Sequence, residues 1–156
     1  MPRLDRLPEA NRKNLLNLPM QANDSAPFTR LAKPLTACRL AIVTTAGLHR
    51  RGDTPFGPGE QTYRVIPADT PAADIVQSHT SLGFDRTAIM RDVNISYPID
   101  RLRELVDRRA LGGLAPNGYS FMGAQRELTK IANETGPEVA GRLRADGADA
   151  VLLTPT

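Results

Sequence analysis

The sequence LAIVTTAG at residues 40–47 and the sequence ADAVLLTPT at residues 148–156 decide the fold. Each begins with aliphatic residues in a nearly unbroken run and ends in small or hydroxyl-bearing residues. Runs of this kind are typical of strands that are buried on both faces of a parallel sheet. We therefore predict that residues 40–44 and 151–154 are central, parallel strands of one sheet.

Shorter apolar runs and helical patterns alternate between these two segments. Strands are predicted over residues 63–67, at a sheet edge, and over residues 74–79. Residues 114–122 have a mixed pattern of loop or strand, and irregular structure is predicted over residues 48–59 and 80–96. Helices are predicted over residues 9–18, 98–111, 124–133 and 137–145, with Gly147 as the C-cap of the last. This alternation predicts an α/β fold, a three-layer sandwich with a mainly parallel sheet.

The first part of the chain differs in composition from the rest. Residues 1–37 are polar and rich in proline, with a short helix whose apolar contacts would be Leu15, Leu16 and Leu18. We predict that residues 1–37 form an N-terminal arm and that residues 38–156 form the α/β domain.

Composition excludes several classes of protein. Hydrophobic residues make up 40% and charged residues 24% of the chain, as in ordinary globular proteins. The net charge of +3 is spread along the chain without a nucleic-acid-binding signature, so no nucleic-acid partner is predicted. No apolar run is long enough to span a membrane, and the N-terminus lacks the apolar core of a signal peptide. Cys38 is the sole cysteine, which fits a reducing compartment, and the cytoplasm is the expected location.

The two strand ends supply the first group of candidate site residues. Thr44, Thr45 and Gly47 follow the first strand, and Thr154 and Thr156 follow the last. In open α/β sheets, ligands bind beyond the carboxyl ends of the strands, where free backbone N–H groups favour anions. The alternative is that threonine and glycine are present only because they are common at strand ends and turns.

A second group follows the strand predicted over 74–79. His79 lies in a polar segment with Asp92 and Asn94, and a histidine near a carboxylate can act as an acid or base near neutral pH. The alternative is a histidine that stabilises the loop. No metal site is predicted, because the chain has two histidines and no spacing typical of metal ligands. Cys38 precedes an apolar strand and is interpreted as a small buried hydrophobe.

An ordered set of sequence blocks resembles the selenoprotein B family of glycine, sarcosine, betaine and D-proline reductases, and is most similar to its short bacterial branch. The blocks cover most of residues 35–156. They are LAIVTTAGLHRRGD at 40–53, YRVIP at 63–67, SH at 78–79, FDRT at 84–87, DVN at 92–94, PIDRLREL at 98–105, YSFMG at 119–123 and ADGADAVLLTP at 145–155.

The resemblance implies a redox residue that this sequence does not contain. In the family, the strand matching residues 151–154 is followed by selenocysteine or cysteine, with a second cysteine a few residues later. We therefore expect selenocysteine or cysteine just after Thr156, with a UGA codon read as a stop. A selenolate would be stabilised there by the N-terminus of a following helix.

The resemblance also implies roles and partners. It implies catalytic roles for His79 and Asp92. It implies substrate binding by Thr44, Thr45, Gly47 and Asn94, to which the strand-end pattern adds Thr154 and Thr156. The expected partners are a small-molecule substrate and a thiol reductant such as a thioredoxin-like protein, with a homo-oligomer left open. The predicted function is thiol- or selenol-dependent reductive cleavage of a small substrate, by a domain that lacks its redox residue as given. The alternatives are a non-catalytic subunit that binds a small anion, or an assembly subunit.

Overall fold

The computed structural model describes residues 3–17, 29–81 and 86–156. The chain divides into two compact units, Met1–Arg30 and Leu31–Thr156, and each is described by itself. The predicted boundary between an arm and a domain after residue 37 stays a prediction.

The first unit contains little regular structure among its described residues. A 3-10 turn, η1 (Leu4–Arg6), precedes the helix α1 (Glu9–Leu16). Neither element buries a side chain, and an exposed ion pair joins Lys13 to Glu9 one turn earlier. The predicted helix is therefore confirmed over most of its length, whereas Leu18 lies outside the described residues.

The second unit is built on a five-stranded sheet. Its strands are β1 (Arg39–Thr44), β3 (Tyr63–Pro67), β5 (Gly113–Leu114), β6 (Asn117–Phe121) and β7 (Ala150–Thr154). β1 pairs in parallel with β5 and β6 along one side and with β7 along the other, while β3 pairs antiparallel with β6. The sheet is therefore mixed but mainly parallel, as predicted, and β3 lies at its edge.

The prediction that both apolar strands are central is half right. β1 lies in the middle of the sheet and pairs with β7 over five residues, from Leu40 with Ala150 to Thr44 with Thr154. Among the described strands, β7 pairs with β1 alone and so lies at an edge of the sheet. The aliphatic sequence of β7 is typical of a central strand, although among the described strands β7 is hydrogen-bonded to β1 alone.

A second, two-stranded sheet lies beside the first. β2 (Leu48–Arg50) pairs antiparallel with β4 (Ile75–Gln77), which follows the 3-10 turn η3 (Ala72–Asp74). The prediction that residues 48–59 are irregular is therefore wrong at its start. Leu48 is fully buried, and its backbone N–H donates to the Ser120 hydroxyl of β6 at 2.8 Å, which fixes β2 against the main sheet.

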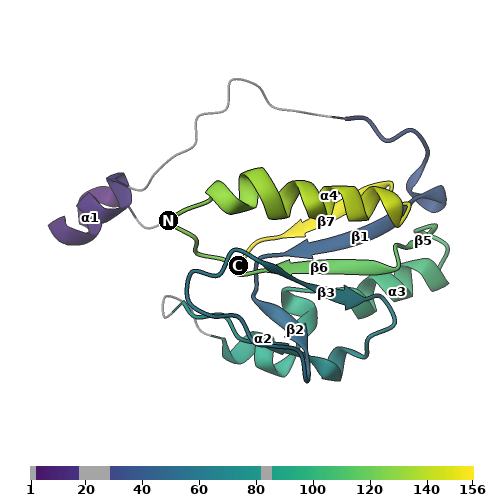
Figure 1. Cartoon of the computed structure of the whole chain (residues 1–156), viewed down its shortest axis with the longest axis horizontal. Helices are drawn as coiled ribbons and strands as arrows, with labels where there is room; N and C mark the ends of the chain where they lie inside the picture. Colours follow the sequence, from purple (N-terminus) through teal and green to yellow (C-terminus); the bar gives the residue numbers. More distant parts are fainter. Residues whose placement is uncertain (1–2, 18–28, 82–85) are drawn as a thin grey trace. The chain divides into compact units, whose positions relative to one another are not determined.

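Helices cover both faces of the main sheet and complete the predicted three layers (Figure 1). One face carries α2 (Thr87–Arg91), the 3-10 turn η4 (Val93–Ile95) and α3 (Ile99–Asp107), and the other carries α4 (Gly136–Ala145), which continues a π-helical segment, η5 (Ile131–Thr135). The 3-10 turn η2 (Leu35–Ala37) precedes β1.

Three helix predictions need comment. The prediction of irregular structure over residues 80–96 is wrong where α2 and η4 form. The helix predicted over residues 124–133 begins only at Thr129, because Ala124 has a φ of 54°, outside the right-handed helical region. The helix predicted over residues 137–145 is confirmed as α4, and Gly147 follows it with a φ of 70°.

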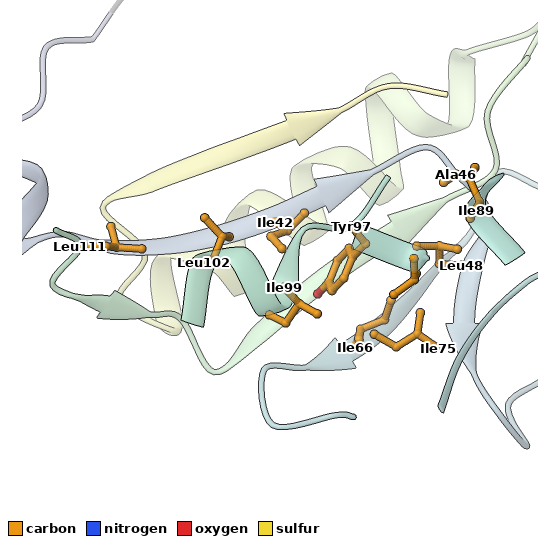
Figure 2. Close-up of a cluster of buried hydrophobic side chains, with 11 residues drawn as sticks. Ile42, Ala46, Leu48, Ile66, Ile75, Ile89, Tyr97, Ile99, Leu102 and Leu111 are labelled. Atoms are coloured by element: carbon orange, nitrogen blue, oxygen red, sulfur yellow. The ribbon is translucent and has the colours of Figure 1, made fainter. Parts of the chain in front are cut away.

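Two hydrophobic clusters fill the spaces between the layers. Ile42 of β1 packs with Tyr97 and Leu102 on the α3 side, within the cluster drawn in Figure 2. Its neighbour Ala41 packs with Val139 of α4 on the opposite side. Because successive strand residues point to opposite faces, β1 contributes to both clusters, which explains its continuous apolar sequence.

Candidate functional site

The carboxyl ends of β1, β6 and β7 meet at one place, which we call the rim. It comprises residues 44–47, 122–123 and 154–156. The backbone N–H of Thr45 donates to the carbonyl of Thr154 at 3.2 Å. In turn, the backbone N–H of Thr156 donates to the Thr45 hydroxyl at 3.0 Å. The two strand ends that the sequence singled out are therefore joined directly.

Thr44 holds the rim together from below. Its side chain is fully buried, and its hydroxyl lies 3.0 Å from the carbonyl oxygen of Thr154 and 3.3 Å from that of Ser96. The Thr44 hydroxyl oxygen also accepts from the backbone N–H of Ala46 at 3.2 Å. These bonds lie within the protein, so Thr44 holds the rim in place, and its predicted role in substrate binding stays a prediction.

Gly47 brings His79 to the rim. The residue has a φ of 64°, and a Cβ there would stand 3.1 to 3.2 Å from the backbone and Cβ of His79. The Gly47 carbonyl accepts from the backbone N–H of Ser78 at 2.9 Å, and the Gly47 N–H donates to the backbone carbonyl of Phe121 at 2.9 Å. The backbone conformation and the close approach both favour glycine at this position.

Gly123 marks the point on which the site converges. A Cβ on Gly123 would stand 2.6 Å from the carbonyl oxygen of Thr156, 2.7 Å from that of Thr45 and 2.8 Å from Nε2 of His79. Three polar atoms from three separate segments therefore surround one small position. Sequence reasoning did not select Gly123. Its place directly after an apolar segment, at the end of the block YSFMG, is the signal that could have found it.

The environment of His79 favours a neutral imidazole. The side chain is 1% exposed, and its Nδ1 accepts from the backbone N–H of Ser81 at 3.1 Å. Burial lowers the pKa of His79, and the positive charge of Arg86 lowers it further. Because Nδ1 is an acceptor, the hydrogen-bond pattern assigns the ring proton to Nε2, the nitrogen that faces the Gly123 position.

Asp92 and Asn94 lie along a different hollow. Its volume is about 640 Å³, and its described lining comes from β2, η3, β4, α2, η4 and the start of α3, without a residue of the rim. The Asn94 side chain accepts from the backbone N–H of Asp100 at 3.0 Å. Asp92 accepts from the side-chain amide of Asn94 and from its backbone N–H, each at 2.9 Å, and this hydrogen bonding lowers the pKa of Asp92. Both side chains stabilise the start of a helical turn, and their predicted site roles stay predictions.

Cys38 lies far along β1 from the rim. It precedes the strand, is fully buried, and its thiol lies 3.5 Å from the carbonyl oxygen of Lys33. The two arginines that follow the rim are both paired with carboxylates: Arg50 contacts Asp53 at 3.0 Å and Arg51 contacts Asp74 at 3.9 Å. Neither feature adds a nucleophile or a free cation to the rim.

The described residues contain neither a metal-binding cluster nor a membrane-spanning helix. No three histidine, cysteine, aspartate or glutamate side chains gather there as a metal-binding group. Of the helices in the described part of the chain, none has the length and apolar character to cross a membrane.

The fold and the rim define an α/β protein with a candidate small-molecule site at the carboxyl ends of parallel strands. The chain belongs to the glycine/sarcosine/betaine reductase selenoprotein B family, whose sequence profile matches residues 6–156. This confirms the resemblance found in the sequence blocks.

Named relatives agree with this assignment. The chain is 39% identical over 128 residues to the D-proline reductase subunit gamma of Acetoanaerobium sticklandii, a match that covers 81% of this chain and 52% of that protein. It is 29% identical to the glycine reductase complex component B subunit gamma of Carboxydothermus hydrogenoformans, over 89% of this chain and 33% of that protein. It is 30% identical to the sarcosine reductase complex component B subunit beta of Peptoclostridium acidaminophilum, over 88% and 32%.

The chain therefore spans about half the length of the first relative and about a third of the other two. No solved structure matches it.

Proposed function

We propose that this chain supplies the substrate-binding side of a thiol- or selenol-dependent reductase that cleaves a bond between carbon and a heteroatom in a small molecule. The observation that carries the proposal is the convergence of Thr45, His79 and Thr156 on the position above Gly123. Family membership supports reductive chemistry at this rim. The redox residue would be a selenocysteine or cysteine that follows Thr156.

The rim is suited to present such a residue. The Thr156 N–H is held by the Thr45 hydroxyl, so a residue attached after Thr156 would start beside the Gly123 position. Reduction of the substrate needs two electrons and two protons. The substrate's bond to the heteroatom would be replaced by a C–H bond and an H–heteroatom bond, while the selenol or thiol and a second thiol end as a selenosulfide or disulfide. A thioredoxin-like dithiol would then reduce that bridge.

His79 would donate a hydrogen bond to the departing heteroatom, and the proton that the heteroatom gains would come from the selenol or thiols. Its neutral imidazole carries the proton on Nε2, which faces the Gly123 position, and its lowered pKa keeps the ring uncharged at neutral pH. We propose that the protein works in the cytoplasm, where the pH is near neutral and this imidazole would be uncharged. Gly47 would hold His79 in place, and Thr44 would hold the strand ends.

The names of the relatives support a place in a larger assembly. They are described as subunits or complex components of D-proline, glycine and sarcosine reductases. We propose that this chain likewise works with partner proteins in a reductase complex. A subunit that binds a small anion or assists assembly without chemistry remains the alternative, and the following experiment separates the two.

The test compares residues 1–156 with the same chain extended through the next codons, carrying selenocysteine or cysteine after Thr156. Both proteins are assayed with dithiothreitol and candidate amine substrates, and both are alkylated with iodoacetamide. We expect activity and rapid alkylation in the extended protein alone. A Cys38→Ser variant of the extended protein is the matched control and should retain full activity, because Cys38 is buried before β1.

Two results would overturn the proposal. Equal activity of the two proteins would show that the residue after Thr156 is not required. Loss of activity on Cys38→Ser would make Cys38 the nucleophile. An extended protein that binds a small carboxylate but reduces none of the substrates would favour the non-catalytic alternative.

A further inference from the structure

The side chains of the edge strand β7 are packed on one face of the sheet and exposed to solvent on the other. Leu152 packs against the cluster on the α3 side of the sheet. Its neighbours Val151 and Leu153 point to the opposite face, the one on which α4 lies, and they are 39% and 69% exposed. Parallel strands are ordinarily covered on both faces, so the α4 layer is incomplete above β7.

A hollow accompanies these exposed side chains. It has a volume of about 520 Å³ and is bounded by α4 along one side and by β7 along another. Its lining is mainly apolar and includes Ala140 of α4, Val151 and Leu153 of β7, and Leu128, which is 46% exposed. At one end the lining reaches Thr45, Met122 and Gly123 of the rim. The hollow therefore has the character of an unfilled space between elements, and contiguous apolar surfaces of this kind mark docking sites.

The position of α4 explains why the space is open. Val139 and Leu143 of α4 pack with Ala41 of β1 and with Tyr119 of β6. The helix therefore covers the middle of the sheet and leaves β7 to one side. Neighbouring packed helices lie about 8–10 Å apart, so the exposed half of this layer has room for one helix beside α4.

We propose that the hollow between α4 and β7 is the docking site for an amphipathic helix from the part of the family polypeptide that this chain does not span. The chain covers 52% of the D-proline reductase subunit gamma of Acetoanaerobium sticklandii, so nearly half of that subunit lies outside the match. Leu153 and Val151 would contact the apolar face of the helix. The proposal concerns assembly and does not require reduction at the rim, but the hollow shares Thr45, Met122 and Gly123 with the rim, so a docked helix would border the candidate site.

The test uses that part of the subunit as the probe. The portion of the Acetoanaerobium protein outside its matched 128 residues is prepared as a separate polypeptide and titrated against residues 1–156 by calorimetry. Hydrogen exchange is then measured on the complex. We expect one-to-one binding and slower exchange in β7 and α4. Leu153→Lys should weaken binding at least tenfold. Leu153→Glu, which carries the opposite charge, should weaken it equally, because the effect comes from the lost apolar contact and not from the sign of the charge.

Ile95→Lys is the matched control. Ile95 is 62% exposed in η4, on the other side of the sheet, and its substitution should leave binding unchanged. Circular dichroism checks that each variant is folded. The proposal fails if the probe does not bind, or if Leu153→Lys leaves its affinity unchanged. It also fails if residues 1–156 form a dimer that Leu153→Lys dissociates, because the occupant would then be a second copy of the chain.

Discussion

The imidazole of His79 and the backbone of Gly123 approach so closely that a methyl group on Gly123 would stand 2.8 Å from Nε2. The same methyl group would stand 2.6 and 2.7 Å from two backbone carbonyl oxygens, those of Thr156 and Thr45. Both oxygens belong to backbone just beyond the strand ends, where the Thr45 N–H is bonded to Thr154 and the Thr156 N–H to the Thr45 hydroxyl, so they move less freely than the end of a flexible side chain. The space above Gly123 is therefore kept open by the absence of a side chain.

Gly123→Ala should consequently disturb the rim and lower the free energy of unfolding by about 1–3 kcal/mol, the usual cost of overpacking. Urea denaturation measures the change. Gly141→Ala is the control, because a Cβ on Gly141 meets nothing within 4 Å and alanine is the better helix former. A Gly123→Ala protein as stable as the original would show that the rim can shift without cost.

The pKa of His79 predicts a dependence of stability on pH. In the folded protein this pKa is below its ordinary value of 6.5, so below about pH 6.5 the unfolded chain binds more protons than the folded one. Stability should therefore fall as the pH drops from about 6.5 through the folded pKa. The contribution of one group is at most about 1.4 kcal/mol per pH unit.

Denaturation curves at a series of pH values between 8 and 5 test this expectation. In His79→Gln, which cannot be protonated, the slope between pH 6.5 and 5 should be shallower. Parallel slopes in the two proteins would mean that another group causes the loss of stability in acid.

Asn94→Ala should destabilise the domain by about 0.5–2 kcal/mol. The substitution removes the side-chain oxygen of Asn94, which accepts from the backbone N–H of Asp100 in the first turn of α3. Thermal unfolding measures the change, with Asn133→Ala, an exposed position in η5, as the control. If the substitution instead leaves stability intact and weakens substrate binding in the extended protein, the role predicted from the sequence is the correct one.

Ser120→Ala should remove the link between β6 and β2. The Ser120 side chain is fully buried and accepts from the backbone N–H of Leu48 at 2.8 Å. Loss of the hydroxyl leaves a buried N–H without its acceptor, at a cost of about 1–3 kcal/mol. Equilibrium unfolding in urea tests this, with Thr129→Ala at an exposed position as the control. No loss of stability would show that another acceptor replaces the hydroxyl.

The main sheet was predictable because its signal is local. The apolar run of β1 is long enough to identify a strand buried on both faces, and Gly147 is a recognisable helix end. The short strand β2 was missed, because its pairing with β4 depends on residues about 27 positions away, 50 with 75 and 48 with 77 among them. Ala124 was misread because its left-handed φ contradicts its strong helix propensity.

The grouping of residues at the candidate site was predictable in part. Thr45, His79 and Thr156 were selected from the sequence, and the structure brings them to one point. Gly123 was missed because its role depends on three segments that are distant in the chain, and a glycine after a strand ordinarily indicates only a turn. Asn94 was grouped with His79 because both lie in the polar segment that follows the strand predicted over 74–79. The structure instead places Asn94 in η4, where its side chain bonds to the first turn of α3.

The pairing of β1 with β7 also has a consequence for how the protein reaches its native state. The partners Leu40 and Ala150 are separated by 110 positions, and β1 forms the middle of the sheet. Pairings between such distant positions slow folding, because a long loop must close before the contact is made. During synthesis, β1 leaves the ribosome long before β7 exists. An apolar strand exposed for that interval is vulnerable to aggregation, so we expect this family to depend on chaperones or fast early collapse around Tyr97.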